Sequence, residues 1–280
     1  MRQPDAVRFD AVHLSTDVTL HYAERGDRTG EAIIFLHAYV DSWFTFSQML
    51  PLLSPEYHAF APDQRGHGDS QKPQCCYAVD DYVADVGAFM EAVGIEEATL
   101  VCSSSAGLIA QRVALDEPHR VSRLVLIGSP TTLVNNEAVR EAGKEMLDLE
   151  DPISPEFVRE FLESTTHHPV PEEFLSTLVS ESLKVPARVW REYFEGVVLT
   201  VDDTSRLGEV EARAGAGRAT ALHDPGCPRH RPHDEWPRGA PFGRDRLTEA
   251  KFDGLEERGA VGDRHLADLE QVLLADRDRQ

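Results

Sequence analysis

The sequence has no long hydrophobic run. Its longest apolar stretches, such as Ala32–Leu36 and Leu124–Ile127, fall far short of the roughly 20 residues that span a membrane as a helix. The N-terminal residues MRQPDAVRFD lack the apolar core of a secretory signal peptide. We therefore expect no membrane partner and a cytoplasmic location.

Basic residues are also scarce. The 280-residue chain has 28 Lys and Arg against 49 Asp and Glu, which gives a formal net charge of -21. Because binding to nucleic-acid phosphates requires a basic face, this balance argues against a nucleic-acid partner. Hydrophobic residues make up 41% and charged residues 28%, proportions that are ordinary for a soluble globular protein and predict a packed fold.

Cysteine is too sparse to form a disulfide framework. The chain has four cysteines, of which Cys75 and Cys76 are adjacent. Small secreted domains carry denser and regularly spaced cysteines, whereas disulfides are rare in the cytoplasm. We therefore expect reduced thiols, with Cys75 and Cys76 as an ordinary pair in a loop.

The first half of the chain alternates between strand and helix patterns. Strands are predicted for two alternating stretches between Val7 and Ala23, and for Ala32–Leu36, Tyr57–Pro62, Ala98–Val101 and Val121–Ile127. Helical spacing runs from the loop after Ala32–Leu36 through Leu53, and recurs over Val79–Val93 and Leu108–Leu115. Strands that alternate with helices across short loops predict an α/β fold, with a mostly parallel sheet flanked by helices.

The middle of the chain contains only helical patterns. These cover Glu137–Leu149, Pro155–Ser164, Pro171–Leu183 and Pro186–Leu199. We interpret them as a lid inserted into the sheet, and the alternative is a helical subdomain that only packs. Its apolar side chains belong either to a core or to the lining of an acyl pocket; they are Phe157, Phe161, Phe174, Leu178, Trp190 and Phe194.

The last part of the chain has an unusual composition. Between Ala212 and Arg246, Arg, Ala, Gly and Pro account for 23 of 35 residues, and Leu222 is the only Val, Ile, Leu or Met. This composition predicts no buried strand in the segment. A helical pattern returns over Leu247–Leu274. We divide the chain into an N-terminal core part (1–134), a helical cap (135–204) and an atypical C-terminal part (205–280), with a terminal helix.

A candidate nucleophile lies where the strand at Ala98–Val101 gives way to the next helix. There the sequence reads CSSSA, a serine between small residues on a sharp turn, which presents the hydroxyl of Ser104 at the top of the sheet. Cys102 stands where glycine is usual. Acyl transfer also requires donors for the developing oxyanion, and the amides of Ser105 and of Tyr39, in the loop after an earlier strand, are placed to provide them.

Three motifs together resemble the α/β-hydrolase superfamily. FLHAYVDSW is similar to its oxyanion loop, PDQRGHGDS to its Arg-Gly-His-Gly loop, and LVCSSSAGLIAQ to its nucleophile elbow, in the family's order and spacing. The resemblance covers roughly residues 12–207. It implies an eight-stranded sheet, a helical cap after the sixth strand, and a catalytic triad in the order Ser, acid, His.

The resemblance also implies a reaction class. Relatives that open epoxides or remove halogens carry Asp at the elbow, whereas this chain carries Ser104, so the resemblance favours esterase-like acyl hydrolases. Ala38 replaces the family's usual glycine, a change that matters little because the loop contributes a backbone amide. His37 and His67 correspond to histidines that are structural in the family.

The C-terminal part departs from the family pattern. Neither the Gly-Asp acid loop nor the final Gly-x-Gly-His loop is present, so no triad partner carries over by motif. We hypothesise a frameshift near Arg213, because GC-rich DNA read out of frame yields this excess of Arg, Ala, Gly and Pro. Codons for Arg218–Ala221 can contain a shifted Gly-Asp-Gly. Gene sequencing that finds no apolar strand in either shifted frame would refute this hypothesis.

If the tail is authentic, the general base comes from one of four histidines: His223, His230, His233 or His265. We choose His265 by chain order, with Asp224 as its acid and Asp234 as the alternative. Cys227, His230 and His233 offer zinc-ligand chemistry but lack finger spacing, so we expect no metal. His167 and His168 fit a capping or solvent-facing pair between lid helices.

These patterns lead to one functional prediction and one rival. The prediction is a serine hydrolase that cleaves a small to medium ester or related acyl substrate through an acyl-enzyme on Ser104, without a cofactor. The rival is a non-catalytic or impaired α/β-hydrolase-fold protein, with a binding role or a frameshifted C-terminus. The acyl preference and the oligomeric state are left open by the sequence.

Overall fold

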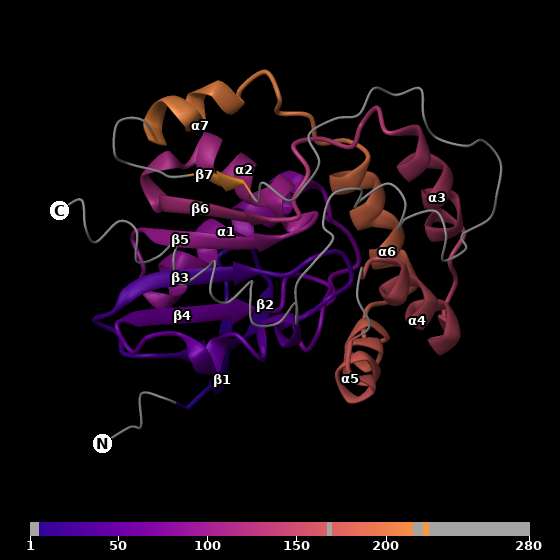
Figure 1. The fold of residues 1–280 in the computed structure, drawn as a ribbon, viewed down its shortest axis with the longest axis horizontal. Coiled ribbons are helices and arrows are strands. Elements are labelled where there is room, and N and C mark those ends of the chain that lie inside the picture. Colours follow the sequence, from indigo (N-terminus) through magenta and orange to yellow (C-terminus); the bar gives the residue numbers. More distant parts are fainter. Residues whose placement is uncertain (1–5, 167–169, 215–220, 224–280) are drawn as a thin grey trace, which may run out of the picture.

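The alternating and continuous apolar runs form the strands of one sheet. The structure, a computed structural model, describes residues 6–166, 170–214 and 221–223 (Figure 1). Its strands are β1 (Arg8–His13), β2 (Thr19–Arg25), β3 (Glu31–Leu36), β4 (Tyr57–Pro62), β5 (Ala98–Ser103), β6 (Val121–Ile127) and β7 (Ala221–His223). The strands predicted in the first half of the chain are confirmed.

The sheet is mixed but mostly parallel. The described residues form seven strands in the order β1-β2-β4-β3-β5-β6-β7. β1 and β2 pair antiparallel, as do β2 and β4, while every neighbouring pair from β4 to β7 is parallel. The carboxyl ends of β3, β4, β5 and β6 therefore meet at one edge, where open α/β sheets place their ligand sites.

Each face of the sheet has its own apolar cluster. Along β3, Ile34 and Leu36 belong to one cluster and Ile33 and Phe35 to the other, because successive strand residues point to opposite faces. This burial on both faces is why the strand is a continuous apolar run rather than an alternating one.

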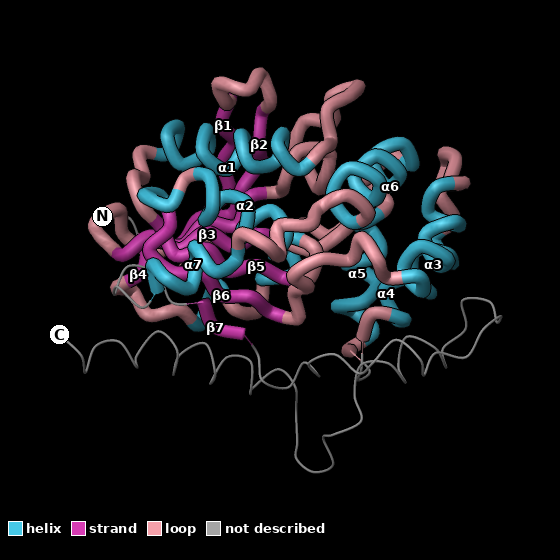
Figure 2. Tube along the Cα trace, turned by 90° about the horizontal axis from the view of Figure 1, so that it is seen from above, coloured by secondary structure: helices cyan, strands magenta, loops and turns pink. Residues whose placement is uncertain are grey.

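Helices cover the sheet and also form a separate group beside it (Figures 1 and 2). α1 (Val79–Val93) and α2 (Ala106–Asp116) pack against each other, and their apolar residues join the cluster of Leu36. The helices of the second group are α3 (Glu137–Leu147), α4 (Pro155–Ser164), α5 (Glu172–Ser182) and α6 (Ala187–Tyr193). A π-helical turn, Phe194–Val198, continues α6, and α7 (Leu207–Ala214) then leads toward β7.

The four predicted mid-chain helices are thus present and lie within the predicted cap segment. The boundaries 1–134, 135–204 and 205–280 themselves remain predictions. In the part of the chain that the structure describes, no helix is both long and apolar enough to span a membrane.

Two local predictions are wrong. The expected helix through Leu53 is two short 3₁₀ turns, Trp43–Phe46 and Leu50–Leu52, because Pro51 lies at the start of the second turn and interrupts the helical pattern. Cys75 and Cys76 form a vicinal disulfide rather than two reduced thiols. The segment predicted to hold no buried strand contributes the short edge strand β7, which contains Leu222; the burial of these residues lies outside what the structure describes, so this prediction stays a prediction.

Candidate active site

The turn between β5 and α2 presents Ser104 to solvent. Ser104 has a φ of 49°, in the left-handed region that residues with a side chain seldom occupy, and it is exposed. Its amide donates to the carbonyl of Ile127 at 2.9 Å, and its own carbonyl accepts from the amide of Gly107 at 3.0 Å. These two bonds hold the sharp elbow between the strand and the helix.

The residues around the elbow are small because the space is filled. Cys102 and Ala106 are fully buried, and a Cβ added to Gly107 would overlap the side chain of Ser129. Burial raises the pKa of the Cys102 thiol far above its ordinary value. The Cys102 thiol is therefore buried and unreactive, whereas the side chain of Ser104 is the exposed one at this turn.

The loop after β3 carries the second predicted oxyanion donor. Its residue Val40 also has a positive φ, 59°, although it is β-branched and fully buried. Among the described residues, no acceptor pairs with the backbone amide of Tyr39 or with that of Ser105. The two backbone donors that the sequence assigns to an oxyanion hole thus have no hydrogen-bond partner in the described part of the chain.

Aromatic residues from the helical group surround the ring of Tyr39. Trp190 and Phe161 meet it edge to face, with centroids 5.4 and 5.8 Å away, and Tyr193 lies 5.4 Å away. The sequence left open whether the mid-chain aromatic residues belong to a core or line a pocket. In the structure, some of them pack over the loop after β3.

His37, the first residue of this loop, and His67, in the loop after β4, are both fully buried, which favours their neutral form. Nδ1 of His37 donates to the carbonyl of Ala38 at 2.9 Å, and its Nε2 accepts from the amide of Gln64 at 3.0 Å. Nδ1 of His67 donates to the carbonyl of Arg65 at 2.8 Å. Burial lowers the pKa of both imidazoles. These contacts fit the structural role that the resemblance implies for both residues.

The predicted general base does not lie among the residues with described side chains. His265, His230 and His233 are outside the described residues, and His223 is described only as the last residue of β7, in register with Leu126. Within the described ranges, no histidine hydrogen-bonds to Ser104. The choice of base remains a prediction.

The other predicted C-terminal site residues fall outside the described part as well. They are the acid Asp224, its alternative Asp234 and the zinc candidate Cys227. The mid-chain pair His167 and His168 also lies outside the described residues. The terminal helix expected over residues 247–274 also lies outside.

Two residues of the site were missed by the sequence analysis. Tyr193 at the end of α6 places its hydroxyl 3.1 Å from Oγ of Ser105. Asp41, two residues after Tyr39, is partly buried, and this burial raises the pKa of its carboxyl from 3.8 to about 7, against the opposing effect of the Thr45 hydroxyl. No local sequence pattern marks either residue, because Asp41 is next to Ser42 and Tyr193 follows Glu192.

One cluster of side chains has the composition of a cation site. Ligand atoms of His21, Asp63 and Asp69 all lie within 4.8 Å of one another. However, Asp63 already accepts from the amides of Trp43 and Asp69 and from His21. Lys184 neutralises Asp69 at 3.0 Å. This cluster is therefore explained as a hydrogen-bonded brace beneath the loop after β4.

Comparison with known proteins identifies the family. A family model described as alpha/beta hydrolase fold matches residues 31–200, which is more than half of the chain. The chain belongs to the α/β-hydrolase fold family. The match spans β3, the elbow at Ser104 and the helices through α6.

The curated relatives carry names of different activities. A non-heme chloroperoxidase of Streptomyces lividans is 35% identical over 131 residues, covering 45% of this chain and 47% of that protein. Epoxide hydrolase 1 of Caenorhabditis elegans is 30% identical over 115 residues, covering 40% and 28%. The chain thus spans about half or less of these relatives' length.

A solved structure, a hydrolase from Pseudomonas aeruginosa PA01, superimposes with a TM-score of 0.64 at 19% identity and covers 77% of this chain and 90% of that one. At this level of identity the likeness shows the shared fold.

Proposed function

We propose that this α/β-hydrolase-fold protein is a serine hydrolase that cleaves a carboxylic ester or a related acyl substrate. Ser104 would attack the carbonyl carbon and form a tetrahedral intermediate, which expels the alcohol and leaves an acyl-enzyme that water then hydrolyses. The amides of Tyr39 and Ser105 would bind the oxyanion of that intermediate. The substrate is a small molecule, and the mechanism requires no cofactor.

One observation carries this proposal. The exposed Ser104 is held at a φ of 49° on the strand-to-helix turn, and the amides of Tyr39 and Ser105 are without an acceptor among the described residues. A strained turn persists only where the surrounding structure enforces it, and such strain concentrates at functional sites. A nucleophile and two amides supply the attacking group and the oxyanion donors of acyl transfer, and a general base completes the set.

The nucleophile also separates ester cleavage from epoxide opening, the activity named for some relatives. Attack of a serine hydroxyl on an epoxide would leave an ether on the enzyme, which water does not hydrolyse under mild conditions. Attack on an ester leaves another ester, which the same site can hydrolyse. Ser104 therefore supports acyl chemistry, whereas the epoxide route requires a carboxylate at this position.

Proton transfer requires a base that the chain must supply from its C-terminal part. We keep His265 as the proposed base and Asp224 as the carboxylate that orients it, with His223, His230, His233 and Asp234 as alternatives. A histidine held by a carboxylate would take the Ser104 proton and return it to the leaving alcohol.

The test is turnover of a short-chain aryl ester together with covalent labelling by a serine-directed phosphonate. We expect Ser104→Ala to lower kcat/KM by about four orders of magnitude, or to background, and to abolish labelling. Ser180→Ala, an exposed serine on α5, is the matched control and should leave both unchanged. Labelling at a serine other than Ser104 would refute the assignment.

The same assay tests the proposed base and acid. His265→Ala and Asp224→Asn should each reduce turnover strongly, whereas His119→Ala, at an exposed histidine, should not. If His265→Ala retains full activity, the same substitution at His223, His230 and His233 identifies the base.

A second candidate is a protein that keeps the fold and the elbow but has no working base. The observation that favours it is that no described histidine contacts Ser104. In that case the wild-type protein would neither turn over the ester nor react with the phosphonate. A binding role would then replace the proposed catalysis.

A further inference from the structure

Helix α6 contacts both residues that would form the oxyanion hole. The hydroxyl of Tyr39 donates to the backbone carbonyl of Trp190 at 2.8 Å. The side-chain oxygens of Ser105 and Tyr193 lie 3.1 Å apart, within hydrogen-bond distance. Tyr39 follows β3 and Ser105 follows β5, so two loops that are distant in sequence are tied to one short helix.

These contacts leave the proposed catalytic atoms free. Each bond uses the side chain of its oxyanion residue, whereas the proposed oxyanion donor is that residue's backbone amide. The carbonyl of Trp190 has two lone pairs, and it accepts from the amide of Phe194 as well as from Tyr39. The side-chain bond therefore fixes the position of the amide without occupying it.

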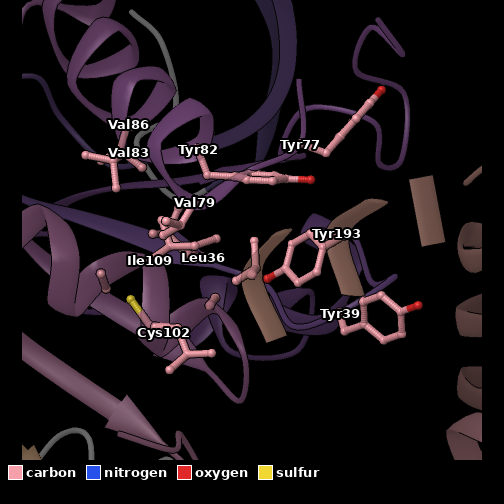
Figure 3. Packing of buried hydrophobic residues seen from close by; sticks show 14 of the residues in the cluster. Leu36, Tyr39, Tyr77, Val79, Tyr82, Val83, Val86, Cys102, Ile109 and Tyr193 are labelled. Atoms are coloured by element: carbon pink, nitrogen blue, oxygen red, sulfur yellow. The ribbon is translucent and has the colours of Figure 1, made fainter. Parts of the chain in front are cut away.

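The helix is a rigid support for these bonds. Val189, Trp190 and Tyr193 are fully buried, and the ring of Tyr193 lies between those of Tyr82 and Tyr39, with centroid distances of 5.0 and 5.4 Å (Figure 3). A Cβ on Gly196 would come within 2.7 Å of the carbonyl of Tyr77, so the π-helical turn packs closely on this backbone and leaves no space for a side chain there.

Both phenol groups remain able to donate. Burial raises the pKa of Tyr39 and of Tyr193 well above the ordinary value, so both hydroxyls stay protonated at neutral pH. Their bonds to Trp190 and Ser105 therefore persist across the pH range in which an esterase is assayed.

We propose that α6 is the positioning element of the oxyanion hole, acting through Tyr39 on one side and through Tyr193 and Ser105 on the other. This inference rests on the proposed function. It assigns to the helical segment a role in the chemical step, in addition to covering the site. Tyr193 is a positioning residue, because its hydroxyl acts through Ser105.

The test removes single hydroxyl groups without changing the shape of the core. Tyr193→Phe and Tyr39→Phe should each lower kcat by about tenfold and leave KM within about twofold, because a misplaced donor weakens the transition state more than substrate binding. The rate of phosphonate labelling at Ser104 should fall in parallel, and the thermal midpoint should change little.

A matched control and a mutant cycle separate positioning from general packing. Tyr82→Phe removes a buried hydroxyl that has no hydrogen-bond partner among the described residues, from a ring that packs on Tyr193, and it should leave kcat unchanged. Ser105→Ala should match Tyr193→Phe, and the double variant should lose no more than either single variant, because all three break one bond.

A readout independent of activity keeps the inference testable if the wild type proves inactive. The backbone amide resonance of Ser105, identified by its displacement in Ser105→Ala, should also move in Tyr193→Phe and stay in place in Tyr82→Phe. An inactive, unlabelled wild type would refute the proposed function, while this resonance would still decide the role of α6.

The inference is overturned by either of two results. One is an unmoved Ser105 amide resonance in Tyr193→Phe. The other is an active wild type in which Tyr193→Phe and Tyr39→Phe keep kcat, or in which Tyr82→Phe lowers kcat as much as they do.

Discussion

Two turns at the same edge of the sheet adopt the same unfavourable backbone conformation with opposite surroundings. Val40, in the loop after β3, has a φ of 59° and is fully buried; Ser104, in the loop after β5, has a φ of 49° and is exposed. Each departs from the conformations that a residue with a Cβ prefers. The two turns differ in what offsets this cost.

At Val40 the cost of the backbone conformation is offset by burial of the side chain. The side chain joins the main apolar cluster, so the transfer of its methyl groups from water compensates for the backbone strain. At Ser104 no side-chain burial is available, and the conformation is held by backbone hydrogen bonds and by the close packing of Gly107 on Ser129. The comparison indicates that the first turn is shaped for packing and the second for exposure of its hydroxyl.

The largest expected effect concerns Asp41, the neighbour of Val40. Because its folded pKa is raised to about 7, the folded state prefers the protonated carboxyl, so stability falls as the pH rises from about 4 to about 7. Asp41→Asn cannot ionise. It should exceed the wild type in stability by an amount that grows over this window and levels off at about 2 to 4 kcal/mol above pH 7.

Urea unfolding at pH 5 and pH 8 measures this difference. Asp148→Asn, which replaces an exposed carboxyl at the end of α3, is the control and should show a much smaller dependence on pH. A gain from Asp41→Asn that is the same at both pH values would show that the carboxyl is ionised in the folded protein throughout.

A smaller effect is expected at Val40 itself. Val40→Gly removes the backbone strain but also removes a fully buried side chain, and the packing loss outweighs the relief. We expect a net destabilisation of about 2 kcal/mol, measured by urea unfolding. A stabilised variant would show that strain, rather than packing, dominates the energetics of this turn.

The sequence predicts some elements of the fold and misses others. Four elements have the bounds expected from their apolar patterns: β4, α1, β6 and α4. Their apolar residues recur at a regular spacing because one or two faces of each element are buried. β7 was not predicted because a segment of three residues with a single large aliphatic side chain shows no hydrophobic periodicity. The pairing of β7 with β6 depends on tertiary contact.

The candidate site was predictable only where it depends on local backbone. The elbow serine and the two loop amides follow from motifs of a few residues, each set by one turn. The link from Ser105 to Tyr193 joins residues 88 positions apart, and that from Tyr39 to Trp190 joins residues 151 apart. Such contacts depend on how the helical segment packs against the sheet, which no local pattern encodes.

The smallest expected effect completes the comparison. Ser104→Gly relieves the strain and removes no buried group, so it should stabilise the protein by about 0.5 to 1 kcal/mol, opposite in sign to Val40→Gly. Ser104→Ala keeps the Cβ and should give no such gain. Urea unfolding of the three proteins measures the difference. Equal stability of the two variants would show that the turn stores no strain. In that case the exposure of Ser104 would follow from the strand-to-helix connection alone.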